Sequence, residues 1–108
     1  MARFHKVALV EEIPPGTGKP VDVDGVKVAL FNVEGRFHAI DNVCPHQGGP
    51  LGEGFVRGRI VTCPFHFWQF DVTTGRCPEF PDASVSRFAV KVDSREVSVS
   101  PEPLNEEP

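Results

Sequence analysis

Two stretches of the sequence carry most of its information: CPHQGGPL at residues 44–51 and CPFHFWQFDVTTG at residues 63–75. Each stretch begins with a thiol and places an imidazole two or three positions later, in a loop beside an expected strand. These spacings allow the two side chains of a pair to converge on one point. Two such points on neighbouring loops would form a metal site of two cysteines and two histidines. The candidate ligands are Cys44, His46, Cys63 and His66.

The whole chain has the composition of a small β protein. Its 108 residues are enough for one domain with a modest core. Valine and phenylalanine, with 16 and 9 residues, far outnumber the 4 leucines and 1 methionine, which favours a core built from strands. Ten glycines and 11 prolines fit many tight turns between short strands. The predicted fold class is therefore all-β.

Turn signals and alternating residues indicate where the strands lie. Asp24-Gly25 is a strong hairpin signal between two apolar runs, and Glu34-Gly35 makes the next turn. No stretch is predicted to be helical. Proline and glutamate dominate from Pro101 onward, so residues 1–100 are predicted to form the domain and residues 101–108 a flexible acidic tail. Strands are expected at residues 4–10, 20–24, 26–33, 36–40, 59–62, 68–72, 88–92 and 97–99.

The two stretches together resemble the two-part signature of Rieske [2Fe–2S] proteins, and the resemblance extends over about residues 3–100. It implies an antiparallel β-sandwich that carries a smaller cluster-binding subdomain. It also implies that Cys44 and Cys63 hold one iron of the cluster, while the two histidines hold the other. The loop that shields the cluster in this family would correspond to the stretch around Pro78 to Pro81.

The residue types also fit such a cluster on chemical grounds. Neutral imidazoles in place of two thiolates leave the site two charge units less negative, so an electron is accepted at a higher potential. Gly48, Gly49 and Gly52 allow the backbone to approach a cluster, whose sulfides need nearby N–H donors. A zinc-stabilised binding module is the alternative. Zinc motifs, however, more often pair Cys with Cys, and they do not need the segment WQFDVTTG that follows here.

Departures from the family pattern indicate which kinds of Rieske protein the chain does not resemble. Respiratory Rieske proteins carry an extra cysteine in each loop, joined as a disulfide, and Gly49 and Phe65 stand at the matching positions. They also place Ser and Tyr hydroxyls near the cluster, where this chain has Trp68 and Phe70. The chain has no room for the catalytic iron domain of an oxygenase large subunit.

The resemblance therefore implies a one-electron carrier between a flavin-dependent reductase and an oxygenase, not catalytic alone. The small [2Fe–2S] subunit of an NAD(P)H nitrite reductase, bound to its large subunit, is the alternative within the same family.

Charge and hydropathy argue against other classes of function. The formal net charge is −4, from 11 Lys and Arg against 15 Asp and Glu. Without a basic stripe, nucleic-acid binding is not expected. No apolar run approaches the length of a membrane span, and the run at residues 7–10 is too short for a signal peptide. We therefore expect a monomeric, cytoplasmic protein that does not bind membranes.

Several further residues have expected roles outside the ligand set. Cys77 is interpreted as a small, semi-buried filler, and the Phe-rich residues 65–70 as a packing wall around the loop. Many members of the family have glycine after the second histidine, whereas this chain has Phe67, which we expect to shape a partner-docking surface. The remaining candidates are expected to belong to the scaffold or to solvated turns: His5, His38, Arg57 and Arg59.

Overall fold

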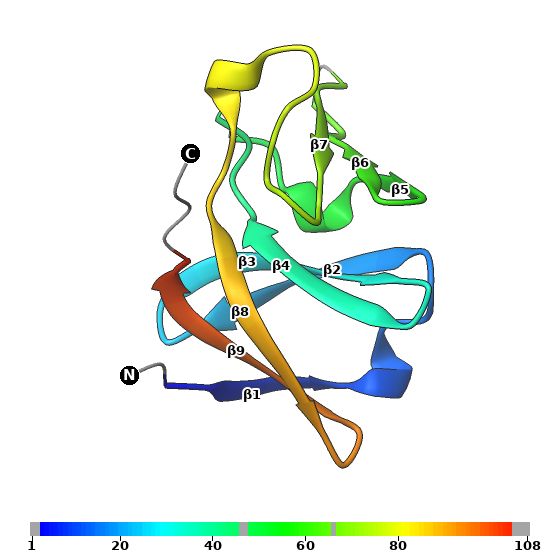
Figure 1. Cartoon of the computed structure of the whole chain (residues 1–108), viewed down its shortest axis with the longest axis vertical. Helices are drawn as coiled ribbons and strands as arrows, with labels where there is room; N and C mark the ends of the chain where they lie inside the picture. Colours follow the sequence, from blue (N-terminus) through cyan, green and yellow to red (C-terminus); the bar gives the residue numbers. More distant parts are fainter. Residues whose placement is uncertain (1–2, 46–47, 66, 105–108) are drawn as a thin grey trace.

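The computed structural model describes residues 3–45, 48–65 and 67–104, apart from the side chain of Pro81. Six antiparallel strands form the base sheet, in the order β1-β9-β8-β4-β3-β2 (Figure 1). A small sheet of three antiparallel strands, β5-β6-β7, lies above it in this view. The strands are β1 (His5–Leu9), β2 (Thr17–Val23), β3 (Val26–Val33), β4 (Arg36–Asp41), β5 (Phe55–Arg57), β6 (Ile60–Thr62), β7 (Gln69–Asp71), β8 (Arg87–Asp93) and β9 (Glu96–Pro103).

The helical content of the described chain is limited to three short 3-10 turns: Val10–Glu12, Leu51–Glu53 and Pro81–Ala83. The predicted all-β class is therefore confirmed. None of these helices is long and apolar enough to cross a membrane in the part of the chain that is described.

The predicted hairpins are present and have the geometry that their residues favour. Asp24 and Gly25 both have positive φ, at 52° and 89°, where they join β2 to β3. Glu34 and Gly35 repeat this arrangement between β3 and β4, with φ values of 53° and 91°. Two consecutive residues of positive φ match the right-handed twist of the paired strands, which explains why Asp-Gly is such a strong hairpin signal.

Two cores lie on opposite faces of β3. Val28 and Leu30 point into the first core, while Ala29 and Phe31 point into the second, because successive side chains of a strand alternate between faces. The first core is formed within the base sheet: Ala8, Ile13, Val21, Val23, Val28, Leu30, Ala39, Phe88, Val97 and Val99. The second core joins the base sheet to the small sheet: Ala29, Phe31, Ile40, Cys44, Leu51, Val61, Cys63, Phe70, Val72 and Cys77.

The segment between β4 and β8 forms a subdomain that leaves the base sheet and returns to the adjacent strand. β4 and β8 pair directly, with Ile40 opposite Arg87, and the N–H of Asp41 donates to the carbonyl of Ser86 (3.0 Å). Residues 42–86 are therefore an insertion between two neighbouring strands. They carry the small sheet and both predicted ligand loops, as the expected subdomain does.

The expected elements differ from the structure in three places: β2 begins at Thr17 and not at Pro20, β5 was not expected, and the start of the tail was misplaced. The expected tail begins too early, because β9 continues to Pro103, opposite Phe88, and the N–H of Leu104 donates to the carbonyl of Arg87 (2.7 Å). β1 pairs with β9 only as far as Val99. Beyond Val99, β9 has β8 as its one neighbour and is an edge strand, where a proline without an N–H donor is tolerated. β5 was missed because it lies among Gly52, Gly54 and Gly58, which indicate turns and not a strand.

Candidate metal centre

Two backbone loops begin at the predicted cysteine ligands. The N–H of Cys44 donates to the carbonyl of Gly49 (2.9 Å), which closes one loop shortly after β4. The N–H of Cys63, directly after β6, donates to the carbonyl of Trp68 (2.7 Å) and closes the other. Each thiol is thereby fixed at the base of a tight turn. We call these the first loop and the second loop: residues 44–51 and 63–68.

The two thiols are buried next to each other in the second core. Cys44 is 1% exposed and Cys63 is fully buried. Burial raises the pKa of the Cys63 thiol, and the adjacent Cys44 side chain raises it further, while the N–H of Phe65 lowers it. That N–H lies 3.4 Å from Cys63 Sγ and donates to it. Two neighbouring thiols with a backbone donor on the sulfur are suited to holding one metal ion as thiolates.

The first and second loops meet at Gly49. A Cβ atom on this residue would lie 2.6 Å from Cys63 Sγ, closer than a real Cβ atom approaches, and 3.1 Å from Phe65 Cβ, which is a tight contact. A residue with any side chain would therefore push the loops apart. The predicted approach of these glycines to a cluster stays a prediction. What the structure shows is close packing within the protein, here and at Gly52, where a Cβ would lie 2.6 Å from the Pro20 nitrogen, whereas a Cβ on Gly48 would meet nothing within 4 Å.

The two predicted histidine ligands, His46 and His66, lie outside the described residues. Within the described residues, no group of three or more metal-ligating side chains comes together. The structure thus places the two predicted cysteine ligands next to each other, and metal binding by all four residues stays a prediction. Cys77 was expected to be semi-buried but is 1% exposed, in the same core as the two cysteine ligands.

The expected packing wall at residues 65–70 was wrong for two of its rings. Phe70 is fully buried, but Phe65 is 48% exposed and Phe67 is 66% exposed. Phe67 also has a φ of 63°, in the left-handed region that favours glycine. A glycine would adopt this φ without strain, whereas Phe67 presents its ring to solvent in a conformation that is strained for it.

An aromatic stack connects the second loop to the segment that follows β7. The rings of Trp68 and Phe80 lie 4.5 Å apart, with 21° between their planes. Phe80 belongs to residues 76–83, which we call the proline loop and which contain the stretch expected to shield the cluster. Trp68 also packs against the second core.

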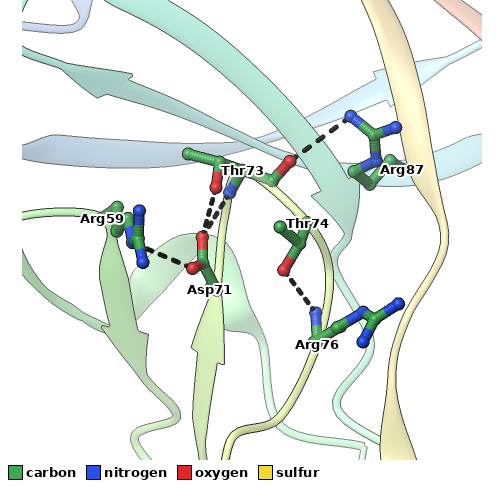
Figure 2. Close-up of polar contacts among 6 residues, drawn as sticks. All are labelled: Arg59, Asp71, Thr73, Thr74, Arg76 and Arg87. Atoms are coloured by element: carbon green, nitrogen blue, oxygen red, sulfur yellow. Dashed lines mark hydrogen bonds and ion pairs between the residues drawn. The ribbon is translucent and has the colours of Figure 1, made fainter.

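A polar network missed by sequence analysis holds the small sheet to the base sheet (Figure 2). Asp71 Oδ1 accepts hydrogen bonds from the N–H of Thr73 (2.9 Å) and from its hydroxyl (2.6 Å). Asp71 Oδ2 lies 3.0 Å from Nε of Arg59, and the carbonyl of Thr73 accepts from Nη1 of Arg87 (3.3 Å). Arg59 lies in a solvated turn as expected, but it is also an ion-pair partner. The contacts between Asp71 and Thr73 are local, whereas only the folding of distant segments brings Arg59 and Arg87 to them, so the sequence analysis did not identify the network.

The two scaffold histidines lie in strands, as expected. His5 lies in β1 and His38 in β4, and both are half-buried. Burial lowers the pKa of His38, and the positive charge of Arg87 lowers it further, against the opposing influence of Asp71.

Comparison with known proteins agrees with this arrangement. The family model of the Rieske [2Fe–2S] domain matches residues 3–94. The ferredoxin component of a naphthalene 1,2-dioxygenase system from Pseudomonas aeruginosa is 38% identical over 89 residues, which are 82% of this chain and 86% of that protein.

Two solved structures represent the two functional branches. A chain from the complex of reduced oxygenase and oxidized ferredoxin in carbazole 1,9a-dioxygenase superposes with a TM-score of 0.87 and 32% identity, covering 95% of this chain and 97% of that one. A putative NADH-dependent nitrite reductase small subunit from Mycobacterium tuberculosis superposes with a TM-score of 0.85 and 29% identity, covering 93% of this chain and 96% of that one. The fold is common to both branches.

Proposed function

Because this chain belongs to the Rieske [2Fe–2S] domain family, we propose that it carries single electrons from a flavin-dependent reductase to an oxygenase. The observation that supports this most directly is the pair of buried thiols, Cys44 and Cys63, adjacent to each other where two closed loops meet. Similarity to ferredoxin components of oxygenase systems supports the class of acceptor.

The ligand residues of the two loops have specific parts in this proposal. Cys44 and Cys63 hold one iron as thiolates, and His46 and His66 hold the other as neutral imidazoles. A bound [2Fe–2S] cluster of this type takes up and releases one electron. The N–H of Phe65 donates to Cys63 Sγ, which withdraws negative charge from the sulfur and favours the reduced state.

The chain delivers electrons, and its partner carries out the reaction on the substrate. We expect a monomer in the cytoplasm that exchanges partners through small, transient interfaces. The body of the protein has almost equal numbers of positive and negative residues, so long-range charge contributes little to steering.

Spectroscopy with matched cysteine variants tests the cluster and its ligands. The purified protein should be coloured, bleach with dithionite, and develop an EPR signal on reduction. Cys44→Ser and Cys63→Ser should lose the visible absorbance, as should His46→Ala and His66→Ala. Cys77→Ser is the control, because Cys77 is equally buried in the same core but is not a proposed ligand. A colourless zinc protein, or loss of colour only in Cys77→Ser, would overturn the proposal.

The nitrite reductase small subunit is the second candidate function, favoured by the similarity to the M. tuberculosis structure. Gel filtration and electron-transfer assays distinguish the two. A free carrier elutes alone and supports turnover of a ring- or hydrocarbon-oxidising oxygenase when a flavin reductase is added. A nitrite reductase subunit co-purifies with a large partner and supports reduction of nitrite instead.

A further inference from the structure

The proline loop is anchored at both ends but exposed along its crest. Cys77, near its start, is buried in the second core, and Ala83, at its end, packs against that core. The backbone bonds within it are short-range: Phe80 N–H to the Cys77 carbonyl (3.2 Å) and Ala83 N–H to the Phe80 carbonyl (2.8 Å). From the crest, the ring of Phe80 reaches across to the second loop and contacts Trp68.

Phe80 covers the outer face of Trp68. The two rings are stacked, 4.5 Å apart, and Phe80 remains 47% exposed while Trp68 is half-buried. Trp68 therefore lies between Phe80 on the solvent side and the second core on the other. An offset stack of this kind stabilises its two segments beyond the burial of apolar area.

Trp68 in turn closes the second loop. Its carbonyl accepts the hydrogen bond from Cys63 N–H (2.7 Å), so the position of Trp68 fixes the backbone of the cysteine whose sulfur is a proposed ligand. A contiguous series of contacts thus runs from the ring of Phe80 through Trp68 to Cys63. Every contact in this series joins residues within the described ranges.

From these contacts we propose that Phe80 is a positioning residue for the metal centre. Its ring clamps the proline loop onto Trp68, which keeps the second loop closed and limits the access of water and chelators to the Cys63 side of the cluster. The inference rests on the proposed cluster but concerns its protection, not its electron-transfer partner. The open and closed forms of the clamp should differ in population by about 2- to 12-fold, the range that corresponds to one aromatic stack.

Phe80→Ala tests the proposal, and the chain offers a built-in probe because Trp68 is its only tryptophan. Phe80→Tyr is the conservative variant, since it keeps the ring and the stack. Phe55→Ala is the matched control: Phe55 is 65% exposed on the small sheet and stacks on no ring among the described residues.

Three measurements are made on each cluster-loaded protein: acrylamide quenching of Trp68 fluorescence, the rate at which a chelator bleaches the visible absorbance, and the reduction potential. In Phe80→Ala we expect stronger quenching, bleaching about 2- to 12-fold faster and a higher potential, since water stabilises the more negative reduced state. Phe80→Tyr should behave as the wild type, and so should Phe55→Ala.

Two results would overturn the proposal. Unchanged quenching in Phe80→Ala would mean that the stack does not protect Trp68 in solution. Stronger quenching with bleaching and potential equal to those of Phe55→Ala would mean that the stack serves packing alone. The wild-type absorbance and its bleaching by dithionite decide the proposed function separately, before any variant is compared. If Phe80→Ala does not fold, Phe80→Leu retains the apolar bulk without the ring and is held to the same criteria.

Discussion

The buried carboxylate of Asp71 holds three polar contacts within the subdomain, and its replacement by asparagine should lower the stability of the protein. Asp71 is 8% exposed and accepts two hydrogen bonds from Thr73 besides its ion pair with Arg59 (Figure 2). The substitution Asp71→Asn would keep the shape of the side chain but lose its charge, and the new amide would place a donor against the guanidinium.

The expected loss of stability follows from the surroundings of each contact. Hydrogen bonds to a charged group contribute about 1.5–3 kcal/mol each, and the amide retains part of the two Thr73 contacts. The side chain of Arg59 is 68% exposed, so the ion pair adds less than about 1 kcal/mol. We therefore expect a loss of about 3 kcal/mol. With an unfolding entropy of about 2.1 cal/mol/K per residue, the unfolding midpoint falls by about 13 °C.

Thermal unfolding of the cluster-loaded protein, followed by circular dichroism at one fixed scan rate, measures this shift. Asp22→Asn is the matched control, because Asp22 also accepts a backbone N–H, from Gly25 (2.8 Å), and pairs with a cation, Lys27 (3.4 Å), but does so in solvent. Its midpoint should change much less. Equal shifts in the two variants would refute the reasoning that burial makes the Asp71 network strong.

Three further predictions concern the loops and the base sheet. Phe67→Gly should raise the free energy of unfolding by about 1 kcal/mol, because glycine adopts the positive φ of this position without strain. Phe67→Ala should not raise it, and equal urea midpoints for the two variants would contradict the prediction. His38 should titrate below the ordinary histidine pKa of about 6.5, so its contribution to stability is complete above that pH and is lost as the pH falls through the lowered pKa. NMR titration measures the pKa of His38. In His38→Phe, the free energy of unfolding should no longer fall with decreasing pH over that range by the amount that His38 contributes; an unchanged pH dependence would contradict the prediction. Gly49→Ala should lower the unfolding midpoint, because the added Cβ would lie 2.6 Å from Cys63 Sγ and push the two loops apart, and a midpoint equal to that of the wild type in thermal unfolding would refute this close approach.

Features carried by neighbouring residues were predictable from the sequence. The Asp24-Gly25 and Glu34-Gly35 turns fix two hairpins, and their strand limits follow closely. The glycines of the first loop were predicted to allow approach to a cluster, whereas the packing of Gly49 on the second loop became visible only in the structure. The resemblance to a known family supplied the subdomain and the four iron ligands only as expectations, and all four ligands are still expectations.

Features that depend on distant residues were not predictable in the same way. Asp71 gains its role from Arg59 across a strand pair, which the sequence order does not reveal. The backbone strain at Phe67 and the stack of Trp68 on Phe80 depend on how two loops fold against each other. A segment rich in proline and glutamate is usually interpreted as a flexible tail, but β9 continues to Pro103 because its pairing with β8 outweighs the local composition.

The direct pairing of β4 with β8 has a consequence for how the protein can be assembled and engineered. Residues 42–86 leave and re-enter the base sheet at adjacent points, so they behave topologically as one long loop of a hairpin. The entropy of closing a loop grows only with the logarithm of its length, so the base sheet can tolerate a large insertion here. The subdomain still depends on the base sheet for Ala29, Phe31 and Ile40 of the second core, so a graft between two antiparallel strands of another sheet would keep its ligand loops in place only where that sheet offers an equivalent apolar face.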